Sequence, residues 1–160
     1  MTKPNRISTC LWFDREGEEA ANLYTSLFDN SHITAVSRHG KGSNLPEGTA
    51  WLIEFTLDGT PFQILNAGPH FKLTEAASIS VNCDTQAEID RLWTRLTANG
   101  GAESRCGWLK DRFGVSWQIV PSQMSTWMRG KDPARIARVV AAFMPMAKLD
   151  IATLEAAYRG

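Results

Sequence analysis

The sequence predicts an α+β fold built from two copies of one unit, in which a strand and a helix precede three strands. One observation is a repeated pattern: Gly59–Leu65 (GTPFQIL) returns 55 residues later as Gly114–Val120 (GVSWQIV). The other is that Asp14 and Asp84, 70 residues apart, each end a strand and precede a helix. Self-similarity of this kind indicates a duplication. The matching glutamines of the two copies suggest two half-sites that face one cavity.

In the first half, apolar residues at helical spacing follow acidic residues that suit the start of a helix. Asp58-Gly59 is a strong two-residue hairpin signal between two strand-forming runs. The polar, glycine-rich stretch 40–48 is expected to be a mobile loop. The expected elements are strands at 7–13, 32–38, 50–57 and 61–66 and a helix at 17–28.

In the second half, Thr85 and Glu88 form a capping box at the start of a helix, and Asn99-Gly100-Gly101 ends it. A turn is expected near 110–114. The expected elements are a helix at 86–98 and strands at 78–83, 103–109 and 115–120.

Beyond Pro121 the sequence predicts short helices at 125–128, 133–144 and 150–158. Asp132-Pro133 is an N-cap followed by proline at the first helical position. We expect this tail to lie on the surface of the duplicated core or across a subunit boundary, as a packing appendage without chemistry of its own.

The composition restricts the class of partner. The 17 Lys and Arg balance the 17 Asp and Glu, which argues against general electrostatic binding to nucleic acid or to an anionic membrane. No apolar run reaches the roughly 20 residues of a membrane span, and residues 1–6 lack the apolar core of a secretory signal. The three cysteines have no CxxC spacing. The sequence therefore predicts a cytoplasmic protein with free thiols.

Several segments together resemble the PhnB-like branch of the vicinal oxygen chelate (glyoxalase/bleomycin-resistance/dioxygenase) superfamily, whose members often carry the label 3-demethylubiquinone-9 3-methyltransferase. The segments are Cys10–Asp14 (CLWFD), Glu19–Tyr24 (EAANLY), Asp111–Gly114 (DRFG) with Trp117-Gln118, and Met146–Tyr158.

The resemblance implies two βαβββ modules with curved mixed sheets around a cavity, plus C-terminal helices. On this basis residues 1–160 form one glyoxalase-like domain, with modules at 5–70 and 76–121 and a helical extension at 122–160. The resemblance also implies a homodimer, in which the chains can exchange modules.

In metal-dependent members of the superfamily, each module supplies a first-strand ligand, often His, and a last-strand Glu. The matching positions here are Ser8 and Ser78 in the first strands, with Thr9 or Cys10 as alternatives to Ser8, and Gln63 and Gln118 in the last strands. Neutral hydroxyls and amides are poor ligands for a divalent ion. We therefore expect no metal and no other cofactor.

The residues expected to line the cavity are polar groups at the ligand positions, one thiol, and two aromatic residues beside loops. Cys10 is expected to be a buried structural thiol rather than a nucleophile, because no activating partner is visible. His32, His39 and His70 show no ligand spacing, and no catalytic residue can be assigned. The expected cavity residues are Ser8, Cys10, Gln63, Ser78, Gln118, Phe71 and Trp108.

The leading hypothesis is a metal-independent protein that binds a small, flat or aromatic molecule, as the drug-sequestering resistance proteins of the superfamily do. One alternative is a lyase, isomerase or dioxygenase with an atypical metal site or metal-free acid–base chemistry. Another is a protein with a closed cavity that acts through its tail. A methyltransferase is the labelled alternative, although the sequence lacks the GxGxxG turn that often holds such cofactors.

Overall fold

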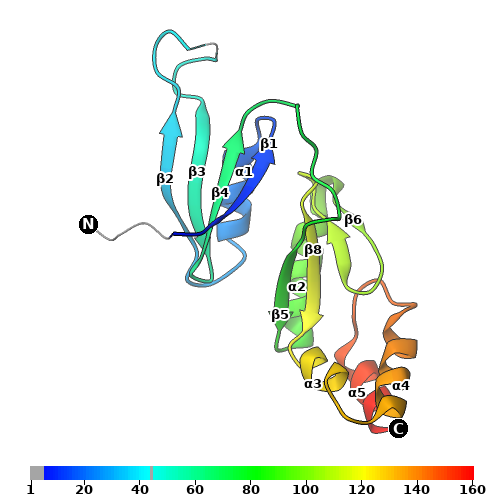
Figure 1. Cartoon of the computed structure of the whole chain (residues 1–160). Coiled ribbons are helices and arrows are strands. Elements are labelled where there is room, and N and C mark those ends of the chain that lie inside the picture. The colour runs from blue at the N-terminus through cyan, green and yellow to red at the C-terminus, as the bar shows by residue number, and fades with distance from the viewer. Residues whose placement is uncertain (1–5, 44) are drawn as a thin grey trace. The chain divides into compact units, whose positions relative to one another are not determined.

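The computed structural model describes residues 6–43 and 45–160. The chain forms two compact units, Met1–Leu73 and Thr74–Gly160 (Figure 1). Within the described residues, no helix has the length and apolar content that a bilayer span requires.

The first unit is a helix packed on a four-stranded mixed sheet with the strand order β1-β4-β3-β2. Strands β1 and β4 run parallel, and the other neighbours are antiparallel (Figure 1). Its elements are β1 (Thr9–Phe13), α1 (Gly17–Thr25), β2 (His32–Arg38), β3 (Ala50–Leu57) and β4 (Thr60–Asn66).

Alternation along the strands explains which face of this sheet is buried. Leu11, Ile53 and Ile64 are at most 8% exposed and lie in register across β1, β3 and β4. They pack with Ala20 and Tyr24 of α1, which are fully buried. Side chains one position away along each strand point to the opposite face, which α1 does not cover.

The second unit repeats this arrangement, with the strand order β5-β8-β7-β6 and β5 parallel to β8. As predicted, the Thr85 hydroxyl caps the helix by accepting from the Glu88 backbone N–H at 3.2 Å. The elements are β5 (Ile79–Cys83), α2 (Gln86–Thr97), a 3-10 turn (Ala98–Gly100), β6 (Ala102–Glu103), β7 (Trp108–Lys110) and β8 (Ser116–Pro121).

The predicted fold class is therefore confirmed: the chain is α+β, and each half is a βαβββ unit with an open sheet. Some expected bounds were wrong. The first strand begins at Thr9 and the first helix ends at Thr25. The expected strand 103–109 is divided into β6 and β7, because Cys106 (φ 58°) and Gly107 (φ 83°) adopt positive φ and turn the chain. Residues 1–5 and Asn44 of the expected loop 40–48 lie outside the described residues.

The predicted C-terminal helices are present and build a small core of their own. They are α3 (Met124–Met128), α4 (Pro133–Phe143) and α5 (Ile151–Arg159). The side chains buried in this core are Trp127, Val139, Leu149 and Leu154.

The tail is attached to the second unit by specific hydrogen bonds. The backbone N–H groups of Cys106 and Gly107 donate to the carbonyls of Met146 and Ala147, at 2.7 and 2.8 Å. The side chain of Gln86 in α2 bonds to the backbone on both sides of Asp150. The tail therefore fixes the β6–β7 turn, from which Trp108 extends.

Candidate functional site

The uncovered face of the first sheet carries a row of three chemically different side chains. Cys10, Gln63 and Glu54 lie opposite one another on β1, β4 and β3. Their strand neighbours Ile53 and Ile64 are fully buried on the side of α1. Alternation therefore places the thiol, the amide and the carboxylate together on the open face.

Gln63 is hydrogen-bonded to Ser8, which lies just before β1. The side-chain Nε2 of Gln63 donates to Ser8 Oγ at 2.6 Å, and both residues are half-buried. This bond uses one amide hydrogen. It leaves the Gln63 Oε1 as an acceptor and the Ser8 hydroxyl hydrogen as a donor, so the pair can bind a ligand that both accepts and donates.

The second sheet repeats this geometry on its own open face. Gln118 Nε2 donates to Ser78 Oγ at 2.8 Å. Gln118 pairs with Ser80 of β5 on one side and with Trp108 of β7 on the other. In both sheets, the serine lies two residues before the strand residue that pairs with the glutamine. The Ser–Gln pair is thus a feature of the duplicated unit.

An aromatic pair adjoins the first open face. Trp12 and Phe71 form an edge-to-face pair with ring centroids 4.7 Å apart and an interplanar angle of 80°. The indole Nε1 of Trp12 donates to the Gly68 carbonyl at 2.8 Å, which fixes the ring. Phe71 is 66% exposed, so one aromatic ring is held in place and the other remains accessible to a ligand.

The structure thus gives each predicted cavity residue a definite place. Each serine lies against its own glutamine, Cys10 and Trp108 flank the glutamines, and Phe71 contacts Trp12. The convergence of both halves on one cavity stays a prediction.

The expected cavity residues did not include Glu54 and Trp12, although signals for both were present. The Asp58-Gly59 turn, with φ of 46° and 74°, pairs Leu57 with Thr60 and hence Glu54 with Gln63. Trp12 follows Cys10 by two residues on the same strand, so it shares the open face.

Neither Cys10 nor Cys83 is an activated nucleophile. Cys10 is exposed, which contradicts the expectation that it is buried; β1 is an edge strand, and alternation directs Leu11 rather than Cys10 toward α1. Partial burial of its thiol nevertheless raises the pKa of Cys10. Burial also raises the pKa of Cys83 to about 12, with Glu88 adding to the effect. Both shifts disfavour the thiolate that nucleophilic chemistry requires.

A divalent metal ion does not fit the Ser–Gln pairs. Their oxygens are neutral, and each serine Oγ already accepts a hydrogen bond from its glutamine. Such oxygens do not offset the cost of dehydrating a divalent cation. Across residues 6–43 and 45–160, no three His, Cys, Asp or Glu side chains are grouped so that they could share a metal ion.

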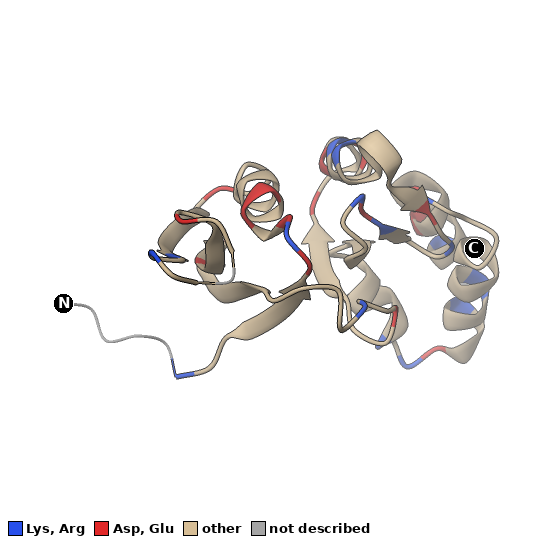
Figure 2. Ribbon diagram, turned by 90° about the horizontal axis from the view of Figure 1, so that it is seen from above, with Lys and Arg blue, Asp and Glu red and all other residues tan. Residues whose placement is uncertain are grey.

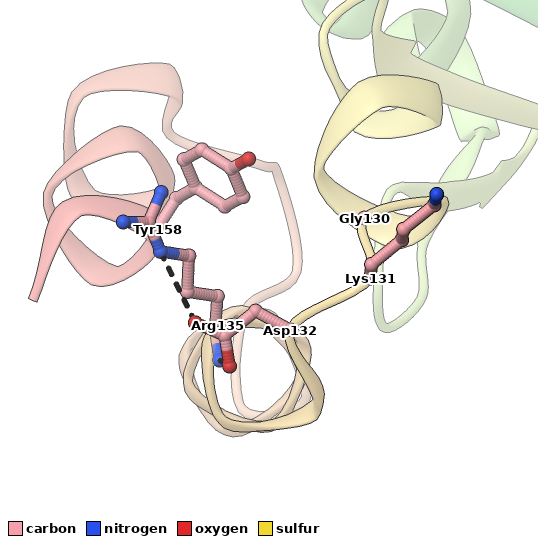
Figure 3. A pocket seen from close by; sticks show the side chains of 5 residues that line it. All are labelled: Gly130, Lys131, Asp132, Arg135 and Tyr158. Atoms are coloured by element: carbon pink, nitrogen blue, oxygen red, sulfur yellow. Dashed lines mark hydrogen bonds and ion pairs between the residues drawn. The ribbon is translucent and has the colours of Figure 1, made fainter.

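A separate hollow of about 420 Å³ lies among the C-terminal helices, where the sequence predicted no site (Figure 3). The Arg135 guanidinium lies 5.3 Å from the centroid of the Tyr158 ring and 3.4 Å from a carboxylate oxygen of Asp132. In Figure 3, Lys131 points away from this group. Arg135 is therefore already paired with residues of the tail itself.

The chain resembles known proteins over most of its length. Residues 5–120 match the model of the family described as 3-demethylubiquinone-9 3-methyltransferase. A putative 3-demethylubiquinone-9 3-methyltransferase, the PhnB protein from Bacillus cereus, is 37% identical, with a TM-score of 0.68 over 73% of this chain and 99% of that one. No curated protein matches the sequence.

More distant structures share the fold. A protein from Pseudomonas aeruginosa is 22% identical, with a TM-score of 0.61 over 74% of this chain and 98% of that one. The fosfomycin resistance protein FosX from Mesorhizobium loti is 16% identical, with a TM-score of 0.54 over 86% of this chain and all of that one. The chain thus belongs to the PhnB-like family that carries the 3-demethylubiquinone-9 3-methyltransferase description, and it has the fold of the vicinal oxygen chelate superfamily.

Proposed function

We propose that this protein binds a small, polar aromatic molecule on the open faces of its sheets without a metal ion. The observation that carries the proposal is the Ser–Gln pair that occurs at the same register position in both units. Each pair offers one free acceptor and at least one free donor on a half-buried surface. This combination orients a neutral polar group and supplies no charge for a cation such as Zn²⁺.

The surroundings of each pair support an aromatic ligand. Trp12 and Phe71 adjoin the open face of the first unit, and Trp108 lies directly beside Gln118 in the second. Small-molecule sites are mainly apolar, with a few placed polar groups. The two open faces have this composition, because aromatic rings lie beside the side-chain amide of a glutamine on each.

Enzymatic activity of the superfamily's metal-dependent kind is the competing function. It requires charged or imidazole ligands, and the equivalent positions here hold Ser8, Gln63, Ser78 and Gln118. We do not propose methyl transfer, because the family description is the only feature that suggests it.

We further propose that the two modules and the helical extension act as one glyoxalase-like domain, and that the protein is a cytoplasmic homodimer. The apolar residues of the tail support association, since Met144 is 53% exposed beside the small core of the C-terminal helices. Light scattering on the purified protein tests this proposal, because a mass equal to one chain at micromolar concentration contradicts it.

The binding proposal predicts the outcome of a thermal-shift screen. We expect bicyclic aromatic compounds with a hydrogen-bonding group, such as hydroxyquinolines and quinolones, to raise the melting temperature, because ligands that bind the native state stabilise it. Replacing Gln63 and Gln118 with leucine should reduce the shift by more than half. The control is Gln123→Leu, because Gln123 lies between β8 and α3 and donates to the Asp84 carbonyl at 3.4 Å. It should leave the shift unchanged.

Divalent ions provide the comparison in the same screen. If Mn²⁺, Zn²⁺ or Ni²⁺ stabilises the protein and no organic compound does, the binding proposal is wrong and the enzyme alternative is favoured. If neither class changes the melting temperature, the proposal is also wrong, and a role through the tail is favoured instead.

A further inference from the structure

The open face of the first unit carries one negative charge that the proposed function does not use. Glu54 lies in the central part of β3, directly opposite Gln63, and its side chain is exposed. In the part of the chain that the structure describes, no cation pairs with it. Its position beside the Ser8–Gln63 pair means that a ligand on this face meets a carboxylate.

An apolar row lies next to this polar row. Trp12, Leu65 and Leu52 are opposite one another on β1, β4 and β3, two residues along from Cys10, Gln63 and Glu54. All three are half-buried, and Phe71 packs against Trp12. The two rows are therefore separated by roughly 7 Å along the strands, and neighbouring strands by about 4.8 Å. A bicyclic aromatic molecule has the length to span them.

The charges of the first unit favour a cation as well. Residues 1–73 contain six Lys and Arg against eight Asp and Glu, whereas residues 74–160 contain eleven against nine. Figure 2 colours the positions of these residues along the ribbon of each unit. Among the described strand residues, alternation places only two other titratable groups on this open face, Cys10 and His32. His32 is the first residue of β2, and its Nδ1 lies 3.4 Å from the Thr56 hydroxyl.

We propose that the open face of the first unit selects a small aromatic cation. Its ring lies over Trp12, Leu65 and Phe71, and its positive charge lies beside Glu54. The Ser8–Gln63 pair binds a polar substituent of the ligand, because Gln63 lies on β4, between the strands of Trp12 and Glu54. A cation over an aromatic ring gains a further attraction, which is strongest for Trp. This inference rests on the proposed function and adds the charge and ring size of the ligand.

Two isosteric probes test the charge preference. N-methylquinolinium is a bicyclic cation, and 4-methylquinoline, measured at pH 8 where it is neutral, is its uncharged counterpart. We expect calorimetry at low salt to show that the cation binds roughly fivefold more tightly, which is the scale of an exposed ion pair. Glu54→Gln should remove this preference, while Glu47→Gln, an equal charge change in the loop between β2 and β3, should keep it. Added salt should weaken it.

The exposed thiol of Cys10 reports where the probe binds. We expect N-methylquinolinium to slow alkylation of Cys10 by iodoacetamide at least threefold, measured by peptide mass mapping. Cys106, which lies in the second unit, is the internal control and should react at an unchanged rate.

The outcomes separate this inference from the proposed function. Equal affinity for both probes, with Cys10 protected by each and no effect of Glu54→Gln, would overturn the charge preference and leave the binding proposal standing. Protection of Cys106 alone would place the probe elsewhere and overturn the inference. If neither probe binds at millimolar concentration and no compound in the thermal-shift screen stabilises the protein, both proposals are wrong.

Discussion

Asp111→Ala is expected to lower the free energy of unfolding of the second unit by about 3–5 kcal/mol. The Asp111 side chain is 3% exposed. One carboxylate oxygen accepts from the backbone N–H groups of Phe113 and Val115, at 2.9 and 3.0 Å, and the other accepts from the indole Nε1 of Trp117 at 2.9 Å. Alanine leaves these donors without that acceptor, and an unsatisfied buried donor costs about 1–3 kcal/mol.

Asp111→Asn is the matched control, because it keeps the shape and one acceptor oxygen. We expect it to cost about half as much as alanine. Urea unfolding followed by tryptophan fluorescence and circular dichroism measures both variants, with separate transitions fitted if the units unfold independently. A loss below 1 kcal/mol for Asp111→Ala would show that the carboxylate does not organise the β7–β8 turn.

Gly17→Ala is expected to destabilise the first unit by about 2–4 kcal/mol, because added volume in a packed core forces shifts. A Cβ atom at Gly17 would lie near Ile64 Cγ2 and Asn66 Oδ1, both closer than any normal contact. These neighbours have little room to move away from the added atom, since Ile64 is fully buried and Asn66 is 7% exposed. Asn66 Oδ1 also accepts from the Gly17 backbone N–H at 2.9 Å. The gain of about 1 kcal/mol in helix propensity does not offset this.

Gly40→Ala provides the control for this change. Nothing lies within 4 Å of a Cβ atom built at Gly40, so we expect its free energy of unfolding to change by less than about 0.5 kcal/mol. Chemical denaturation of both variants measures these changes in the free energy of unfolding. Equal stability of Gly17→Ala and the unmodified protein would contradict the close packing of α1 on β4.

Much of the fold could be predicted because the signals were local. The Asp58-Gly59 turn fixed the β3–β4 register, and the Thr85–Glu88 capping box marked the start of α2. The division between β6 and β7 could not be predicted, because Cys106 is not a residue type that usually adopts positive φ.

The candidate site was only partly predictable for a related reason. The repeat identified the serines and glutamines, but pairing within each half depends on the parallel register of β1 with β4 and of β5 with β8. Parallel strands are joined by long crossovers, so no turn in the sequence sets their register. The exposure of Cys10 follows from that register together with the edge position of β1.

The central claim is that the two Ser–Gln pairs contact the ligand. The most direct measurement is a ¹H–¹⁵N spectrum of the side-chain amides of Gln63 and Gln118 during titration with the most stabilising compound of the thermal-shift screen. We predict that the side-chain amide signals of both glutamines move and saturate during the titration. Unchanged glutamine signals, with movement confined to residues around Arg135 and Tyr158, would contradict the account.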